Sequence, residues 1–416
     1  MYKYKFIRKK LIKFLFLILC LMPVFSSCSK SDSRTEHAIQ TSCSEETAAV
    51  TSESTQSPSK EIAAYGDDLL ISKLPSKSEC LHENMIWKVD KVCQITGEES
   101  ENDTLKRFSV WGTDLGSMTE LENKIYLFCG DTFADENYGD WRSNVLFIID
   151  DDNPSDGLTI TDAIKDYKTH AKEIIGSKKR DNVEITVIPT HAFTIGETLY
   201  CYYMSVRHWG APGQWDCNHA SLAKSEDKGQ TWRKLEDLIK WPGDSGFIQA
   251  ASFQLKNEIY VWAIPSGRFG GVRLMKVSCD KIESPDEYVY LVGIDHSGQP
   301  VWKPGIEAIY EAIEVVNPPV GEISVIYNEY LGNFVMTYLH EKKSAIVMRE
   351  GLTPWGPWGE EVILAKSSQY PALYGGFMHP EYVEKKGKIF YFAMSQYFPI
   401  YNIMWMKAEL IESNKE

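Results

Sequence analysis

Apolar and polar residues alternate along this chain in short runs that come in pairs. In the first pair, residues 111–133 (WGTDLGSMTELENKIYLFCGDTF), two such runs flank a polar turn centred on Glu122 and Asn123. Alternation with a period of two is typical of β-strands, and a short polar turn between two runs is typical of a β-hairpin. The pattern therefore predicts a hairpin.

Similar pairs recur at residues 190–206, 248–266, 322–340 and 379–396. Third apolar strands follow at 144–150, 219–225, 271–277, 344–350 and 402–410, and outer strands end near Trp232, Trp302 and residues 360–364. Five units of about four antiparallel strands predict an all-β fold, a five-bladed β-propeller. We expect the ring to close between residues 402–410 and an early strand, with a short helix at 161–175 between blades.

The turn at residues 225–232 (SEDKGQTW) has the S-x-D-x-G-x-T-W form of an Asp-box, which joins the third and fourth strands in sialidase-type propeller blades. Asp227 is expected to accept N–H bonds across the turn, Gly229 to supply a positive φ, and Trp232 to pack between sheets. We interpret Asp227 as structural. Trp355 and Trp358 are likewise expected to pack between blades.

The N-terminus predicts export. Residues 1–27 contain a basic segment and a short apolar segment, and they end at the sequence Ser26-Ser27-Cys28. This pattern is typical of a bacterial lipoprotein signal peptide that is followed by a lipid-carrying cysteine, here Cys28. An uncleaved anchor or a plain secretory signal is the alternative. Residues 28–78 are rich in Ser, Thr and Glu and are expected to form a disordered tether. The propeller then occupies residues 79–412, and the protein is expected to be extracytoplasmic and anchored to a membrane.

The net charge limits the kinds of ligand that the protein can bind, and the cysteine content limits the metal sites and disulfides that it can form. The net charge of -14 argues against nucleic acid and anionic lipid, and favours a neutral or cationic ligand. Nine cysteines are present, but Cys20 is expected to leave with the signal peptide and Cys28 to carry the lipid. The other seven are odd in number and lack C-x-x-C spacing, which argues against a zinc site and leaves a Cys80–Cys93 disulfide open. We expect a monomer.

The hairpin at 111–133 also carries an aspartate at the open end of each strand. Equal distance from the turn places Asp114 opposite Asp131, and like charges in that position destabilise a hairpin. In a propeller, the starts of the first strands and the ends of the second strands share one rim of the central channel. A carboxylate pair on that rim suits glycosidic bond cleavage, with a separation near the roughly 6.5–9.5 Å of inverting enzymes. The alternative is structural: Asp114 caps a turn and Asp131 accepts N–H bonds from its loop.

The same rim predicts further candidates. Glu322, at the start of the fourth inner strand, is a third candidate catalytic carboxylate, with a structural or substrate-binding role as the alternative. Aromatic faces stack on sugar rings, and polar side chains bind hydroxyl groups. The predicted substrate-binding residues are Trp111, Trp141, Arg142, His191, Arg207, His208, Trp209, Gln249, Arg268, His340, Tyr374 and His379.

Two of these predictions have alternatives. Arg142 either holds an aspartate ionised, binds a sugar hydroxyl or forms a surface ion pair. His191 and His379 are expected to form a polar plug in the channel, with calcium binding as the alternative. We otherwise expect no metal and no cofactor.

Several motifs resemble a known family. The segments WGTDLG, LFCGDTF, WRSN and PTHAF (111–116, 127–133, 141–144 and 189–193), with the turn at 225–232, resemble a bacterial domain family first described without a function. Its characterised members are endo-D-arabinanases that cleave the D-arabinan of mycobacterial cell walls. The resemblance runs from about Phe108 to Leu410. It implies a five-bladed glycoside hydrolase whose catalytic aspartates correspond to Asp114 and Asp131.

The sequence thus predicts a surface-anchored, inverting glycoside hydrolase acting on a furanose-containing polysaccharide such as arabinan. The alternative is a non-catalytic glycan-binding or scaffold propeller. A sialidase-like enzyme is less favoured, because only one Asp-box is clear and no arginine triad is recognisable.

Overall fold

The computed structural model describes residues 70–71 and 86–411, which lie in the compact unit Ala64–Glu416. The predicted signal peptide, the lipidation site Cys28 and Cys80 fall outside the described residues, so these expectations and the boundaries of the propeller domain stay predictions. Within the described residues, no helix is long and apolar enough to cross a membrane.

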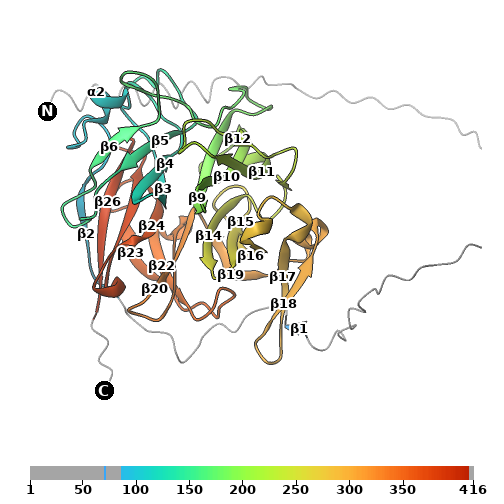
Figure 1. Cartoon of the computed structure of the whole chain (residues 1–416). Helices are drawn as coiled ribbons and strands as arrows, with labels where there is room; N and C mark the ends of the chain where they lie inside the picture. Colours follow the sequence, from blue (N-terminus) through green and yellow to red (C-terminus); the bar gives the residue numbers. More distant parts are fainter. Residues whose placement is uncertain (1–69, 72–85, 412–416) are drawn as a thin grey trace, which may run out of the picture. The chain divides into compact units, whose positions relative to one another are not determined.

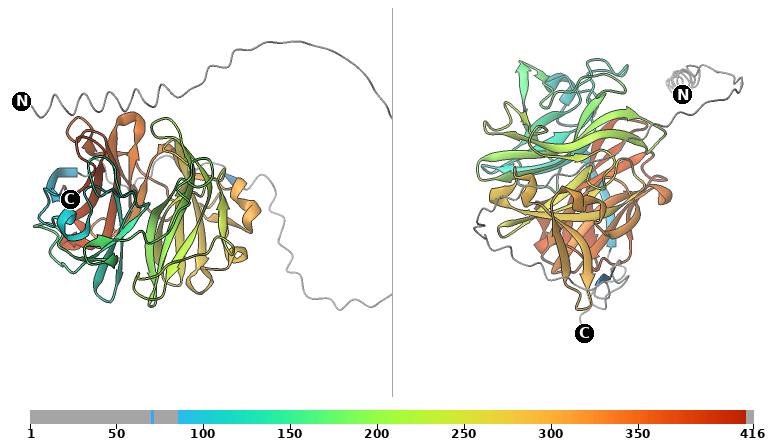
Figure 2. Two further views of the ribbon diagram at one scale, coloured as in Figure 1. Left: turned by 90° about the horizontal axis from the view of Figure 1, so that it is seen from above. Right: turned by 90° about the vertical axis from the view of Figure 1, so that its right-hand side faces the viewer.

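The described residues form five antiparallel sheets arranged as a β-propeller, which confirms the predicted fold class (Figures 1 and 2). Blade 1 contains β3 (Leu115–Leu121), β4 (Lys124–Cys129), β5 (Val145–Ile149) and β6 (Ile160–Ala163). Blade 2 contains β9 (Thr186–Ile195), β10 (Thr198–Trp209), β11 (Trp215–Ser225), β12 (Arg233–Lys234) and β13 (Lys240–Pro242). Blade 3 contains β14 (Gln249–Leu255), β15 (Glu258–Ile264), β16 (Gly270–Ser278) and β17 (Val289–Asp295).

Blade 4 contains β20 (Ile323–Asn328), β21 (Asn333–His340), β22 (Ala345–Gly351) and β23 (Val362–Lys366). Blade 5 contains β24 (Leu373–Glu384), β25 (Ile389–Gln396), β26 (Asn402–Leu410) and β2 (Ile86–Gln94). Blade 3 is extended by β1 (Leu70–Ile71), β18 (Pro300–Pro304) and β19 (Glu314–Val320), and β7 (Lys165–Tyr167) pairs with β8 (His170–Ala171). Short helices are α2 (Thr104–Phe108), η2 (Cys279–Lys281), η3 (Pro285–Glu287), η4 (Ile306–Tyr310), η5 (Glu341–Lys343) and η6 (Lys385–Gly387).

The ring closes as the sequence predicts. The early strand β2 pairs antiparallel with the last strand β26, with Val89 opposite Ala408, and Figure 1 shows the two strands side by side at opposite ends of the colour scale. This pairing covers the edge that the last blade would otherwise expose. The two ends of the propeller therefore hold each other in place.

The helix expected at residues 161–175 is wrong. Residues 160–163 instead form β6, in which Ile160 and Ala163 are buried and Thr161 is exposed. Ala163 pairs with Phe147 of β5, so backbone hydrogen bonds to the neighbouring strand satisfy this segment. Tertiary pairing therefore overrides a weak local helix preference.

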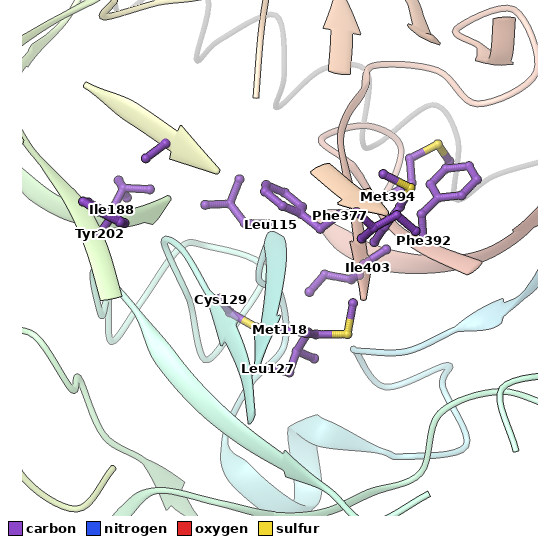
Figure 3. Packing of buried hydrophobic residues seen from close by; sticks show 14 of the residues in the cluster. Leu115, Met118, Leu127, Cys129, Ile188, Tyr202, Phe377, Phe392, Met394 and Ile403 are labelled. Carbon is purple, nitrogen blue, oxygen red and sulfur yellow. The ribbon is translucent and has the colours of Figure 1, made fainter. Parts of the chain in front are cut away.

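Neighbouring blades share an apolar core and a set of inter-blade hydrogen bonds. Figure 3 shows side chains of blades 1 and 5, among them Met118 and Ile403, meeting in this core. Ser117 Oγ accepts the N–H of Ala192 at 2.9 Å, which ties the inner strand of blade 1 to that of blade 2. Small hydroxyl residues on inner strands thus fix the blades around the channel.

The turn at 225–232 has the expected internal contacts. Asp227 Oδ1 accepts the backbone N–H of Thr231 at 2.8 Å, and Gly229 has φ 85°. Trp232 packs edge-on against Phe128 of blade 1, with ring centroids 5.5 Å apart. Asp227 is therefore part of the turn that brings a tryptophan between two blades.

Candidate active site

The hairpin that carries the two aspartates begins as predicted. Glu122 and Asn123 both have positive φ, 52° and 58°, as a two-residue type I′ turn requires. The predicted register holds as far as the pair Ser117–Phe128. Local sequence is sufficient up to this point because turn chemistry sets the register.

The register then shifts at Gly116, and the direct pairing of Asp114 with Asp131 is wrong. Gly116 has φ 124°, a conformation that side-chain-bearing residues rarely adopt, and it forms a bulge. Asp114 accordingly pairs with Gly130, whose N–H donates to the carbonyl of Asp114 at 3.1 Å. Asp131 lies one residue further along. Both aspartates nevertheless line one cavity.

This cavity receives residues from all five blades. They come from the starts of inner strands, the ends of second strands and the loops beside them, which is the rim that the propeller geometry predicts. The lining residues are Asp114, Leu115, Asp131, Ile188, Pro189, Thr190, Met204, Trp209, Trp215, Gln249, Ala250, Arg268, Glu322, Ile323, Tyr374 and Phe377. A mostly apolar wall with a few convergent polar groups is typical of a ligand site.

Asp114 is held in an environment that favours its neutral form. Its Oδ2 accepts a hydrogen bond from the Tyr374 hydroxyl at 2.8 Å. Its Oδ1 is buried and has no hydrogen-bond partner among the described residues. Burial, together with the nearby charge of Asp131, raises the pKa of Asp114 to about 7, while the hydrogen bond from Tyr374 opposes the rise.

The carboxyl group of Asp131 accepts two side-chain hydrogen bonds, whereas that of Asp114 accepts the one from Tyr374. Asp131 Oδ1 accepts hydrogen bonds from Trp141 Nε1 and from the Thr186 hydroxyl, both at 2.7 Å. Burial raises the pKa of Asp131 to about 6, while these two hydrogen bonds oppose the rise. The Tyr401 hydroxyl donates to the Asp131 carbonyl at 3.0 Å, which fixes the backbone beside the carboxyl group. Two donors on one oxygen favour the ionised form of Asp131.

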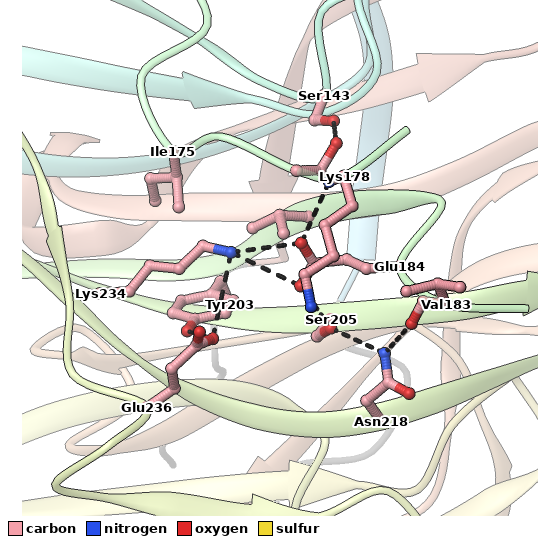
Figure 4. A network of polar contacts seen from close by, with 12 residues as sticks. Ser143, Ile175, Lys178, Val183, Glu184, Tyr203, Ser205, Asn218, Lys234 and Glu236 are labelled. Atoms are coloured by element: carbon pink, nitrogen blue, oxygen red, sulfur yellow. Dashed lines mark hydrogen bonds and ion pairs between the residues drawn. The ribbon is translucent and has the colours of Figure 1, made fainter. Parts of the chain in front are cut away.

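A buried polar network positions the segment whose Thr186 hydroxyl donates a hydrogen bond to Asp131 (Figure 4). Glu184 accepts hydrogen bonds from Lys178 N at 3.2 Å and from the Ser205 hydroxyl at 2.7 Å, and it forms an ion pair with Lys234 at 3.4 Å. Glu184 is 3% exposed, so these partners satisfy its buried carboxyl group. The network thereby holds the start of β9, where Thr186 meets Asp131.

Glu322 faces the same cavity and is ion-paired. Its Oε1 accepts a hydrogen bond from Arg268 Nε at 2.8 Å and forms an ion pair with one terminal nitrogen of Arg268, also at 2.8 Å. The Arg268 guanidinium also lies 4.9 Å from the ring centroid of Tyr374. Glu322 Oε2 and Trp215 Nε1, like Asp114 Oδ1, are buried polar atoms with no hydrogen-bond partner among the described residues. Three such atoms around one cavity are a set of groups that ligand hydroxyls could satisfy.

Four of the predicted substrate-binding residues line the cavity: Trp209, Gln249, Arg268 and Tyr374. Trp141 does not line it but contacts Asp131. Trp111 packs edge-on against Tyr138 instead, at 6.1 Å between ring centroids. The rim prediction therefore selects the correct region and includes residues that lie just behind it.

Arg142 forms an ion pair, which was one of its alternatives, but it neither lines the cavity nor pairs with a cavity aspartate. It is 3% exposed, and its guanidinium donates to the carbonyls of Ser109 at 2.6 Å and Ala171 at 2.7 Å. Its ion-pair partner is Asp140 at 3.6 Å, not a cavity aspartate. Arg142 therefore braces loops of blade 1 against each other.

The remaining predicted positions also lie outside the cavity. Arg207 and His208 are bound to the surface carboxylates of Asp216 and Asp181 at 3.1 and 2.7 Å. His340 Nδ1 accepts the backbone N–H of Lys343 and caps η5. Arg207 and His208 lie near the end of β10 and His340 is the last residue of β21, and each side chain binds a partner on a nearby segment instead of facing the cavity.

His191 and His379 are neighbours in the interior. Burial lowers the pKa of His191 to about 4, and burial together with the charge of His191 lowers the pKa of His379 to about 3. Both rings are therefore neutral at pH 7. Among the described residues, no group of three His, Cys, Asp or Glu side chains is arranged to hold a metal ion.

Two contact residues were missed at the sequence level. Thr186 precedes the expected start of its strand at residue 190, and Tyr401 lies in the loop after the second strand of blade 5. The expectation that strand ends and the loops beside them form the rim of the channel, which we call the rim rule, would have selected Tyr401 if it had been applied to that loop. Nothing in the alternation of apolar residues marks Thr186, because the extra length of β9 depends on pairing with β10.

Comparisons with known proteins agree with this fold. Residues 99–407 match the family described as a domain of unknown function (DUF4185). No curated protein matches the sequence. The chain is similar to the solved structure of a candidate hydrolase from Bacteroides ovatus ATCC 8483, with 12% identity over 74% of this chain and 88% of that chain and a TM-score of 0.52. At this identity the likeness supports the fold alone.

Two further solved structures resemble the chain less closely. One is a candidate exo-beta-1,3-galactanase from Bifidobacterium bifidum s17, with 10% identity, coverage of 78% of this chain and 98% of that chain, and a TM-score of 0.46. The other is a GH43_1 enzyme from Xanthomonas citri, with 12% identity, coverage of 72% and 87%, and a TM-score of 0.44.

Proposed function

The chain belongs to the DUF4185 family, and we propose that it is a glycoside hydrolase whose acid–base pair is Asp114 and Asp131. The observation that carries the proposal is the contrast between the two carboxyl groups of one cavity. Asp114 has an unpartnered buried oxygen and a pKa of about 7, whereas Asp131 accepts two hydrogen bonds and has a pKa of about 6. Two carboxyl groups in environments that separate their pKa values are what glycosidic bond cleavage requires.

Asp114 is the general acid in this proposal. With a pKa of about 7, it keeps its proton in about half of the molecules at pH 7 and in most of them at lower pH, and it can donate this proton to the leaving oxygen of the glycosidic bond. Asp131 is the general base and activates a water molecule for attack on the opposite face of the sugar, as in inverting enzymes. Trp141 and Thr186 hold its carboxylate in one orientation.

The substrate that fits this cavity is a neutral sugar polymer. Of the described residues that line the cavity, Arg268 alone is cationic, and Glu322 and Glu341 lie 2.8 and 3.7 Å from its guanidinium nitrogens. An anionic sugar would find no uncompensated cation there, which disfavours the sialidase-like alternative. The resemblance to endo-D-arabinanases makes an arabinan-like furanose polymer the first candidate.

The activity is expected to have a narrow pH optimum. The value of kcat/KM should rise as Asp131 loses its proton near pH 6 and fall as Asp114 loses its proton near pH 7. The two groups interact, so the two apparent values belong to the pair. A pH–rate profile on a soluble substrate measures them, and an optimum at pH 9 would contradict the assignment.

The proposal is tested by incubating the protein with arabinan, arabinogalactan, xylan and galactan and measuring new reducing ends. Asp114→Asn serves as the matched control, because it keeps the shape of the side chain and removes the acid. Products from arabinan that the variant does not form are the expected result. Binding without products from any glycan would favour the non-catalytic alternative.

Lipid anchoring on Cys28 is a separate proposal, supported by the sequence Ser26-Ser27-Cys28. The protein is expected to fractionate with membranes, and Cys28→Ala should release it or leave an unprocessed precursor. Fractionation and N-terminal sequencing measure this. Wild-type protein free in the medium, with a mature N-terminus elsewhere, would contradict it.

A further inference from the structure

Exposed aromatic side chains gather where the second strand of a blade leads into the third. Five residues share this position, on blades 1, 2, 3 and 5. They are Tyr138 (37% exposed), Trp209 (38%), Phe269 (42%), Tyr397 (56%) and Phe398 (42%). The ends of the second strands form the rim of the cavity, so the loops that carry these rings extend from that rim, and Trp209 lines the cavity itself. Grouped exposed apolar side chains beside a site indicate a binding surface.

One group, which we call the first platform, consists of Tyr138, Tyr397 and Phe398. The Tyr397 ring packs edge-on against Tyr401 with centroids 6.0 Å apart, and the Tyr401 hydroxyl binds the Asp131 carbonyl. Burial and contact with Tyr397 raise the pKa of Tyr138 to about 12. The first platform is therefore joined to the backbone of the proposed base.

The other group, the second platform, consists of Trp209 and Phe269. Trp209 lines the cavity and packs edge-on against Trp215, with centroids 5.5 Å apart. Phe269 follows Arg268, whose N–H donates to the Gly213 carbonyl at 3.0 Å, so the loops of blades 2 and 3 brace each other. This contact fixes the second platform beside the ion pair of Arg268 and Glu322.

The two platforms lie on different sides of the cavity. Blade 5 adjoins blade 1, since Leu115 N donates to Ser395 Oγ at 2.8 Å, and blade 2 adjoins blade 3, since Ala250 N donates to Thr190 Oγ1 at 3.4 Å. The first platform belongs to the former pair of blades and the second to the latter. On blade 4 the corresponding loop is η5, whose residues are Glu341, Lys342 and Lys343. The aromatic rings therefore define a path across the cavity that avoids blade 4.

We propose that a neutral glycan chain follows this path and stacks sugar rings on both platforms while one glycosidic bond lies at Asp114 and Asp131. This inference rests on the proposed function and adds the residues that would hold the polymer beyond the cavity. Aromatic faces offer apolar contact to sugar rings without needing a charge. Affinity should therefore increase with chain length until both platforms are covered.

The test compares binding of long linear arabinan with binding of arabinotriose, in the Asp114→Asn protein so that the glycan stays intact. Phe398→Ala and Phe269→Ala each remove one ring that does not line the cavity. Each should weaken binding of the long chain by about 10-fold, in the range of one aromatic contact. Binding of arabinotriose should change by less than about 2-fold. Tyr310→Ala is the matched control, because Tyr310 is 61% exposed in η4, away from the second-to-third strand loops, and it should bind both glycans normally.

Equal binding of the long chain by the two platform variants and the control would overturn the inference, and the proposed function would stand if the wild-type protein cleaves arabinan. The expected binding pattern without cleavage by the wild-type protein would support the platforms and remove the proposed function. A parent protein that binds long arabinan no better than arabinotriose would also overturn the inference.

Discussion

We expect Asp114→Asn and Asp131→Asn each to lower kcat on arabinan by at least about 10²-fold, because positioned acid–base groups contribute factors of about 10²–10⁴. In the Asp114→Asn variant, the amide cannot supply the proton that the leaving oxygen needs. In the Asp131→Asn variant, the amide cannot accept a proton from water, although its oxygen can still accept the hydrogen bonds of Trp141 and Thr186. The measurement is kcat by release of reducing ends, together with the melting temperature of each variant.

The melting temperature of the Asp114→Asn variant distinguishes a catalytic role of this residue from a structural one. The pKa of Asp114 is raised from 3.8 to about 7, so its contribution to the stability of the fold declines as the pH rises from 3.8 towards 7. At pH 8 the neutral Asn side chain should therefore leave the melting temperature unchanged or raised. Variants that melt early but keep their specific activity would contradict the catalytic assignment and direct attention to Glu322.

Asp131→Ala is the informative comparison for the base. It leaves Trp141 Nε1 and the Thr186 hydroxyl without their acceptor, at a cost of about 1–3 kcal/mol for each group that remains buried. This variant should be less stable than Asp131→Asn and equally inactive.

Gly130→Ala is expected to lower kcat by about 10-fold or more without preventing folding, because a misplaced catalytic group can cost up to about 10²-fold. A Cβ at position 130 would lie 2.4 Å from Asp114 Oδ1 and 3.0 Å from a Leu115 methyl group. The carboxyl group is the easier of the two to move, so the proposed acid is displaced. The backbone of Gly130 does not have a positive φ, so alanine brings little backbone strain.

The control for this variant is Gly176→Ala. Its Cβ would meet only Glu173 Oε1 at 3.8 Å, an ordinary contact, and its φ is also not positive. Activity and melting temperature should stay near wild-type values. Equal activity of Gly130→Ala and Gly176→Ala would mean that the Asp114 carboxyl group tolerates displacement, which a general acid in this position should not.

Local sequence predicts the blades because the residues that fix each hairpin lie within that hairpin. Alternating residues place one face of every strand in the core, and Glu122 and Asn123 form a tight turn without help from other blades. The short fourth strands are harder to predict from the sequence, because a strand such as β12 contains only Arg233 and Lys234 and depends on pairing with β11. The predicted helix at 161–175 failed for the same reason.

The candidate site combines residues that the sequence places far apart. Tyr374 binds Asp114 across 260 positions and Tyr401 binds the carbonyl of Asp131 across 270, contacts that exist only when blade 5 closes on blade 1. The rim rule could select Asp114, Asp131, Glu322 and Arg268, because strand ends repeat from blade to blade. It could not distinguish Arg268, which faces the cavity, from Arg142, which faces backbone carbonyls.

By itself, the sequence determined the β-propeller, the position of its hairpins and the rim on which the two aspartates lie, because strand periodicity and turn chemistry are local properties. Only the tertiary structure decided the bulge at Gly116, the partners of each carboxyl group and the difference between their pKa values. Those features depend on burial and on donors brought from other blades, and neither can be read from the order of residues within one hairpin.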